Sequence, residues 1–172
     1  MKEVAIGACT WLHLIVLVIW IGHMVNALIL FSPLADRYVK TTDYGDFIAE
    51  YRRRDKPVAL VCIAIFFVTG FFLMLLNENY KGIGDILANS WSLVLFTKHI
   101  LVLAMVGLGI YQGSRVMPNL AEASKKLATQ GPDKPENIAT VSRLEKTRRT
   151  VTQALCGLSL LVLLLTAVGE VL

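Results

Sequence analysis

Four long apolar segments, separated by polar stretches, dominate the pattern along the chain. They run from about residue 6 to 31, from 57 to 76, from 91 to 112 and from 151 to 168. Each is long enough to cross the hydrocarbon core of a bilayer, which takes about 20 apolar residues. The pattern therefore predicts an all-α integral membrane protein, a four-transmembrane-helix bundle that forms a single domain over residues 1–172.

The polar connections between these segments predict further structure. Pro57 suits the first turn of the second helix, and a short interfacial helix is expected before it, in residues 34–56. Between the third and fourth segments, residues 119–130 and 136–150 are compatible with helix, and the Gly-Pro-Asp-Lys-Pro sequence at 131–135 predicts a turn. We therefore expect the third and fourth helices to extend beyond the membrane as a hairpin, which forms a long cytoplasmic connection.

The positive charges predict how the helices are oriented. Fourteen of the 17 Lys and Arg residues lie between the first and second or between the third and fourth segments. Because basic residues favour the cytoplasmic side, both termini are expected outside the cytoplasm, in a bacterial-type inner membrane. The net charge of +4 then reflects topology and contact with membrane lipid, and it does not indicate nucleic-acid binding.

All three histidines, His13, His23 and His99, lie inside apolar segments. An ionisable side chain in a bilayer is costly, so each is a functional hypothesis. His13 and His99 each stand roughly 12 Å along helices that run in the same direction, which places them at the same depth in the outer half. Two such imidazoles suit axial ligation of one haem iron in a bundle core. This predicts a bis-histidine haem b.

The neighbours of this pair are candidate cofactor contacts. Trp20 shares the helical face of His13, and Lys98, beside His99, either snorkels to the surface or pairs with a haem propionate or an anionic substrate. His23 is roughly 15 Å deeper than His13 and has no fourth histidine to pair with. It is the candidate for a second metal site. A hydrogen bond between helices, without any ligand, is the alternative for each buried histidine.

Other polar and sulfur-bearing residues are scattered over the apolar segments. Polar groups assigned to the cytoplasmic half suit hydrogen bonds between helices, or a quinone or proton site; they are Asn26, Thr69, Tyr111 and Gln112. The three cysteines lie on three different helices without a CxxC motif, which is typical of packing residues; they are Cys9, Cys62 and Cys156.

Several short motifs resemble known membrane proteins. Residues 11–22, with an early histidine followed by tryptophan and glycine, resemble the first helix of the CopD-like copper-resistance family and of the HemJ-type protoporphyrinogen oxidases. The basic run at 50–57 with Thr69-Gly70, and Trp91 with Lys98, are similar to the second and third helices of that group. In the HemJ-type group the first histidine and the lysine are associated with haem b and porphyrinogen oxidation. The resemblance implies this role for His13 and Lys98.

The sequence also departs from the patterns of both families. The Arg and Tyr-His pattern expected after Gly22 in the HemJ-type group is absent, and the five methionines form no MxxM motif of the kind that soft copper ligation favours. The main hypothesis is therefore electron transfer by a membrane cytochrome b-like protein, with a quinone or a periplasmic redox protein as partner.

Three alternatives remain beside it. The first is a haem-dependent oxidoreductase, a HemJ-like protoporphyrinogen oxidase. The second is a CopD-like copper-handling protein, in which His13, His23 and methionines carry copper. The third is a membrane anchor in a homo-oligomer or a larger membrane complex.

Overall fold

The described part of the protein is almost entirely helical. The computed structural model describes residues 1–31, 33, 39, 41–78, 80, 82, 90–130 and 135–169. The helical elements are α1 (Lys2–Asn26), η1 (Ala27–Phe31), α3 (Thr41–Leu76), α4 (Ser90–Tyr111), η3 (Gln112–Val116), α5 (Met117–Gln130) and α6 (Pro135–Gly169). The described residues contain no strand, which confirms the all-α prediction.

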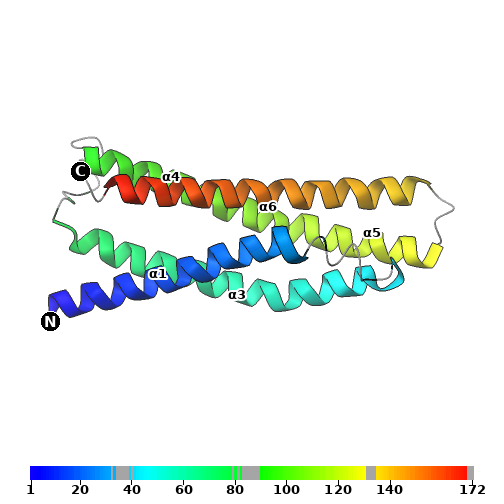
Figure 1. Cartoon of the computed structure of the whole chain (residues 1–172), viewed down its shortest axis with the longest axis horizontal. Helices are drawn as coiled ribbons and strands as arrows, with labels where there is room; N and C mark the ends of the chain where they lie inside the picture. The colour runs from blue at the N-terminus through cyan, green and yellow to red at the C-terminus, as the bar shows by residue number, and fades with distance from the viewer. Residues whose placement is uncertain are drawn as a thin grey trace.

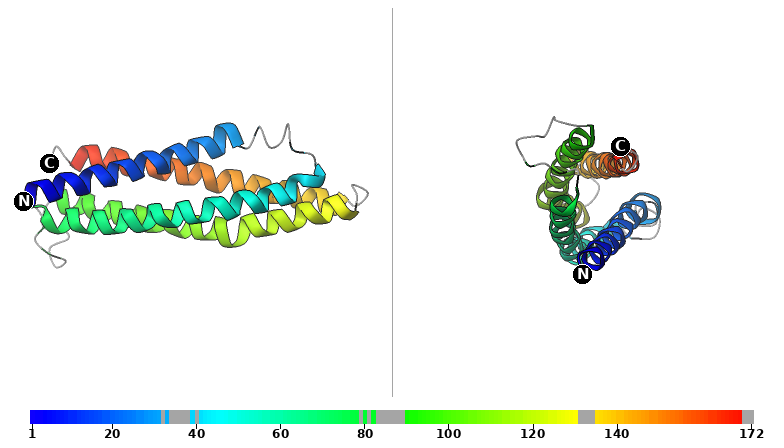
Figure 2. Two further views of the ribbon diagram at one scale, coloured as in Figure 1. Left: turned by 90° about the horizontal axis from the view of Figure 1, so that it is seen from below. Right: turned by 90° about the vertical axis from the view of Figure 1, so that its left-hand side faces the viewer.

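The helices form an elongated bundle with both termini at the same end (Figure 1). α1 lies along α3, and α4 lies along α6, while α5 continues the line of α4 and packs against both α3 and α6. The end-on view in Figure 2 shows the long helices side by side, running along a common direction. Four helices of the described chain are long and apolar enough to cross a membrane.

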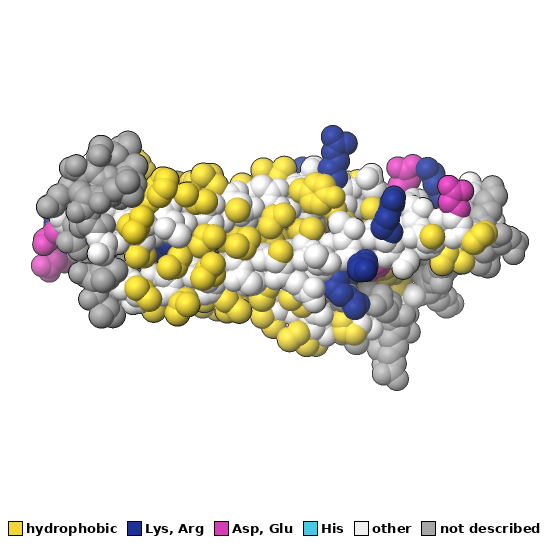
Figure 3. Space-filling view, turned by 90° about the horizontal axis from the view of Figure 1, so that it is seen from above, with side chains coloured by type: hydrophobic (Ala, Val, Ile, Leu, Met, Phe, Trp, Pro, Cys, Tyr) yellow, Lys and Arg dark blue, Asp and Glu magenta, His cyan; other side chains and the backbone are white. Residues whose placement is uncertain are grey.

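The molecular surface is divided into an apolar part and a charged part. Large apolar side chains are exposed along the outer faces, among them Phe71, Leu103 and Leu164. In Figure 3 apolar side chains spread along most of the length, whereas most of the visible Lys and Arg side chains gather toward the end opposite the termini. Exposed leucine and phenylalanine at this density are expected where lipid replaces water as the surrounding medium.

The helices continue well beyond the apolar segments, as the hairpin prediction requires. α5 and the first half of α6 confirm the helical character predicted for residues 119–130 and 136–150. The turn predicted at 131–135 lies outside the described residues except for Pro135, which begins α6. Most of the connection between α3 and α4 also lies outside them.

The prediction for Pro57 was wrong, because it lies inside α3 and not in its first turn. A proline inside a helix costs one backbone hydrogen bond. α3 nevertheless begins at Thr41, since its first half is held by packing: Ile48 is completely buried in a second apolar cluster with Leu120 and Ala121 of α5. Tertiary burial of this kind outweighs the local preference of one residue.

Glycine and a salt bridge bring α3 and α5 together at this end of the bundle. A Cβ atom at Gly45 would stand 2.8 Å from the Ala121 carbonyl oxygen, so only glycine permits this approach. Beside it, the Lys125 ammonium lies 2.6 Å from the Asp46 carboxylate. The charged end is therefore a packed extension of the bundle.

Two π-helical segments interrupt the long rods near the charged end. η1 follows α1, and η3 lies between α4 and α5. A π-helical turn leaves backbone carbonyls without their usual i+4 partner, and such turns occur often at functional sites. One of these carbonyls, that of Gly113, accepts a hydrogen bond of 3.0 Å from Arg52 Nε on α3. This hydrogen bond therefore connects the π-helical turn η3 to α3.

Candidate functional site

His13 lies half-buried between α1 and α3. Its Nδ1 atom is 2.7 Å from the Oγ1 atom of Thr69, which is one of the most buried polar side chains of the described chain. The ring meets the edge of Phe66 with centroids 4.9 Å apart. A Cβ at Gly70 would stand 3.6 Å from His13 Cε1, so the imidazole lies against the helix backbone at that glycine. About one turn of α3, from Phe66 to Gly70, therefore positions the ring.

The hydrogen bonds of Thr69 determine the tautomer of His13. A threonine hydroxyl has one proton to donate, and Thr69 Oγ1 donates it to the Ile65 carbonyl oxygen at 2.7 Å. Thr69 therefore accepts from His13, and the imidazole carries its proton on Nδ1. In the neutral ring the lone pair is then on Nε2. This is the arrangement in which a histidine ligates a metal while an outer partner holds its other nitrogen.

Lys98 on α4 lies near this histidine. Its charge is close enough to interact electrostatically with His13. The ammonium also reaches the end of α6, where a Cβ at Gly169 would stand 3.8 Å from Nζ. The predicted role of Lys98 beside a cofactor or anionic substrate stays a prediction, but the structure does place it on the side of the bundle that holds His13.

His99 and Trp20 make other contacts. His99 is exposed on α4, and its Nδ1 donates to the Leu95 carbonyl oxygen of its own helix at 2.8 Å. Trp20 is buried, donates from Nε1 to Ser159 Oγ of α6 at 3.3 Å, and meets Phe66 edge-on. The structure thus gives His13 and His99 separate partners, so their joint ligation of haem stays a prediction. Trp20 serves as a contact between α1, α3 and α6.

His23 is paired with an acidic residue. Its Nε2 lies 2.8 Å from Asp55 Oδ1 on α3, and the Tyr51 ring stacks on the imidazole with centroids 6.4 Å apart. The Tyr51 hydroxyl oxygen is buried and has no hydrogen-bond partner among the described residues. The ring of Tyr51 also contacts Phe31 of η1. This group lies where α1 gives way to η1.

A buried arginine completes this inner group. Arg148 on α6 is 4 % exposed, pairs with Glu145 at 2.5 Å and lies over the ring of Phe31 at 5.4 Å. Glu145 in turn accepts a hydrogen bond from the Tyr44 hydroxyl. Two groups of polar side chains therefore lie along α1 in the described part of the chain. One contains His13 with Thr69, and the other, the inner group, contains His23 with Asp55, Tyr51, Arg148 and Glu145.

Two of these partners were missed at the level of the sequence. The structure places Thr69 level with His13, because α1 and α3 are antiparallel, so the two residues do not lie in opposite halves of the membrane as the sequence predicted. Asp55, just before Pro57, is the partner of His23. Its role depends on α3 beginning at Thr41, which the predicted helix start at residue 57 could not show. The expected hydrogen bond between helices is confirmed for Gln112, which binds Thr152 at 3.2 Å.

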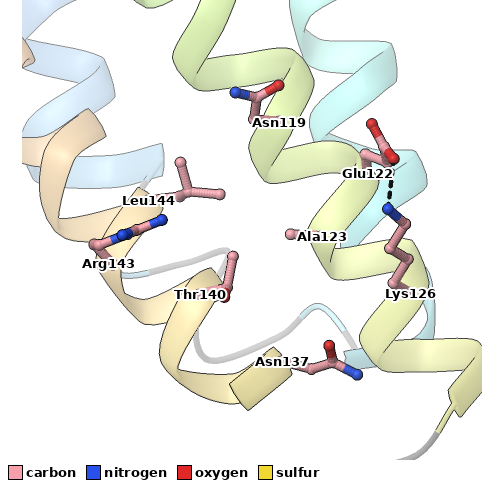
Figure 4. Close-up of a pocket in the computed structure, with 8 residues that line it drawn as sticks. All are labelled: Asn119, Glu122, Ala123, Lys126, Asn137, Thr140, Arg143 and Leu144. Atoms are coloured by element: carbon pink, nitrogen blue, oxygen red, sulfur yellow. Dashed lines mark ion pairs between the residues drawn. The ribbon is translucent and has the colours of Figure 1, made fainter.

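Neither polar group is a complete metal site of the usual kind. Within the described residues, no three His, Cys, Asp or Glu side chains converge to hold a metal ion. A surface cavity of about 350 Å³ lies between α5 and the start of α6. It is lined by polar residues such as Asn119, Thr140 and Arg143, and by the Glu122–Lys126 ion pair at 2.7 Å (Figure 4). It belongs to the charged extension and contains no histidine.

Comparison with known families identifies the chain. The model of the family described as CopD, copper resistance protein D, matches residues 50–169, well over half of the chain. The chain belongs to the CopD family. No curated protein and no solved structure shows a significant similarity to it. The resemblance stated from its motifs is thereby confirmed at the level of the CopD family.

The region that matches the CopD family contains the partners of both α1 histidines but not the histidines themselves. It includes Asp55, Thr69 and Lys98, whereas the two histidines that they face, on α1, precede it. Membership in a copper-resistance family favours the copper alternative over haem-based electron transfer.

Proposed function

We propose that this CopD-family protein binds copper ions inside the membrane and handles them as its substrate. The observation that carries the proposal is the family match over residues 50–169, which includes three of the four long helices. The geometry of His13 supports it, because its Nε2 lone pair is directed away from Thr69 and is not used by that hydrogen bond. Imidazole nitrogen is a good ligand for copper.

The outer partner of His13 strengthens this assignment. Histidines that bind metals commonly donate their second ring N–H to a hydrogen-bond acceptor, and loss of that partner typically costs 10–100-fold in affinity. Thr69 is such an acceptor, and its hydroxyl is held by the Ile65 carbonyl. The site is therefore preorganised before copper arrives.

The location follows from the charge pattern. Because the basic end of the bundle is expected in the cytoplasm, the end with both termini faces the outside of a bacterial-type inner membrane. His13 then lies in the half of α1 that copper reaches first from outside, and His23 lies in the inner half. Copper handling across the membrane is the activity that we assign to the bundle.

The test is a Cu(I) competition titration of the purified protein in detergent against a chromophoric chelator. His13→Ala should weaken binding at least 10-fold, since it removes a ligand nitrogen. His99→Ala is the matched control: it removes an exposed imidazole that bonds only its own helix, and should leave binding unchanged. Visible spectra of the same samples, after haem-supplemented expression, test the haem b hypothesis in parallel.

Two outcomes would overturn the proposal. If the wild-type protein bound no copper, the substrate assignment would fail. If it instead carried a low-spin haem signal that disappeared in both His13→Ala and His99→Ala, the bis-histidine electron-transfer hypothesis would replace it.

A further inference from the structure

The groove between α5 and the start of α6 lies far from the two histidines of α1. Its volume is about 350 Å³. α5 makes most of its contacts with α3 and fewer with α6, so its face toward α6 is less tightly filled. At the centre of that face Ala123 carries only a methyl group, and Thr140 and Leu144 of α6 face it across the groove (Figure 4). Small side chains at the contact therefore leave room for a ligand.

The lining of the groove offers hydrogen-bond donors that no protein group uses. The guanidinium of Arg143 has five N–H groups, and within the described chain its side chain makes no ion pair or hydrogen bond. The same is true of the Asn119 amide. Asn137 donates to the Gln130 side-chain oxygen at 3.3 Å, which uses one of its two N–H groups. The groove is therefore suited to a ligand that accepts hydrogen bonds.

The acidic group and the hydroxyl of the lining are already engaged. The Glu122 carboxylate is neutralised by the Lys126 ammonium at 2.7 Å. The Thr140 hydroxyl donates its proton to the Glu136 carbonyl oxygen at 2.9 Å. The charge that is not neutralised is that of Arg143, so the groove favours an anion. Arginine binds phosphate oxygens through paired N–H groups, which makes phosphate a good match for this lining.

The groove lies just beyond the apolar segments. Arg143 precedes Val151, where the fourth segment begins, by a helical rise of about 12 Å, and Asn119 follows the third segment by about 10 Å. The headgroup layer extends about 5–8 Å beyond the hydrocarbon core on each side. Basic pockets between membrane helices at the cytoplasmic side bind anionic lipid headgroups. At this level a lipid phosphate and a soluble phosphate compound can both reach the groove.

We propose that this groove binds a phosphate ester, whose phosphate group is anchored by Arg143. The hydrogen bond between Asn137 and Gln130 sets the register of the two antiparallel helices, which places Arg143 close to the level of Ala123, at the middle of the groove. Asn119 lies toward the membrane and Asn137 toward the tip of the hairpin, so they are available to the rest of the ester. This site is independent of the proposed copper function.

Two phosphate probes test the proposal on the full-length protein in detergent. Phosphatidylglycerol, added to the micelles, supplies the lipid phosphate, and glycerol 3-phosphate supplies a phosphate ester without acyl chains. Native mass spectrometry counts bound lipid, and a thermal-shift titration measures the affinity for either probe. Wild type should bind at least one of the probes. Arg143→Gln should weaken that binding about 10-fold or more, because it removes charge-assisted hydrogen bonds to the phosphate.

A second variant blocks the groove without changing its charge. Ala123→Leu fills the centre of the groove and should weaken binding to a similar extent. Its control is Ala139→Leu, at an exposed position of α6 that does not line the groove. The control for Arg143→Gln is Arg115→Gln, which removes the same charge from an exposed residue of η3 outside the groove. Both controls should bind as wild type does, and thermal unfolding without ligand checks that each variant is folded.

The outcomes separate the two sources of phosphate and the failure of the proposal. Binding of phosphatidylglycerol alone would identify a lipid site, and binding of glycerol 3-phosphate in the absence of lipid would identify a site for soluble phosphate esters. If neither probe bound to wild type, the phosphate site would be overturned. Equal losses in Arg143→Gln and Arg115→Gln would also overturn it, because they would show a general attraction of the basic end for anions.

Discussion

At the scale of single residues, the hydroxyl of Thr69 controls which nitrogen of His13 is available. Thr69 donates to Ile65 and accepts from His13, so the ring proton is held on Nδ1. The same logic applies to His99, whose Nδ1 donates to a carbonyl, but that ring is exposed on the outside of α4. Burial against α3 therefore distinguishes the two histidines, which the sequence places at equal depth.

Thr69→Val tests whether Thr69 fixes the tautomer of His13, because valine keeps the shape of threonine and removes the hydrogen-bond acceptor. The His13 N–H is then left without its partner, which costs about 1–3 kcal/mol when the group is buried. We expect Cu(I) affinity to fall at least 10-fold and unfolding to occur at lower temperature, while Thr69→Ser restores both.

Thr97→Val is the control for this change. Thr97 makes the same bond to the carbonyl four residues before it, at 2.9 Å to Leu93, but it contacts no histidine in any described interaction. Equal loss of affinity in both threonine variants would show that the effect arises from helix distortion and not from His13.

At the scale of elements, hydropathy predicted the four helices and their order, because burial in lipid requires long apolar segments with satisfied backbones. It did not predict that α3 begins at Thr41, since the packing of Ile48 on α5 is a long-range effect. The site was predicted in the same partial way. His13 is recognisable as a polar residue in an apolar segment, whereas Thr69 and Asp55 acquire their roles only through the register of α1 against α3.

The tie between α3 and the π-helical turn η3 gives a prediction at this scale. Arg52→Met removes the hydrogen bond to the Gly113 carbonyl and leaves that carbonyl without its donor. We expect the free energy of unfolding to fall by about 1.5–3 kcal/mol, as for loss of a hydrogen bond to a charged group. Equilibrium unfolding in mixed micelles measures it.

Arg53→Met is the matched comparison one residue away. Arg53 pairs with Glu50 on the exposed surface, where solvent screens the ion pair, so its loss should change the stability little. If the two variants lost the same stability, the bond to Gly113 would not be what holds η3 against α3.

At the scale of the whole molecule, the proposed copper handling needs a direction, and the asymmetry of charge predicts one. The Lys and Arg residues are concentrated at the end opposite both termini (Figure 3). The positive-inside rule then predicts that the His13 half of α1 faces the outside and that the inner group with His23 and Arg148 faces the cytoplasm. A copper ion that enters from outside would then meet His13 before His23.

This orientation is testable with two cysteine substitutions and a membrane-impermeant maleimide. Glu3→Cys, at the end with the termini, should be labelled in intact cells, because the reagent reaches the outer surface. Lys126→Cys, on α5 at the basic end, should be labelled only after the cells are opened. The unmodified protein is the control, since its three cysteines lie in apolar segments of the helices. Labelling in the reverse order would overturn this orientation and place His23 on the side of copper entry.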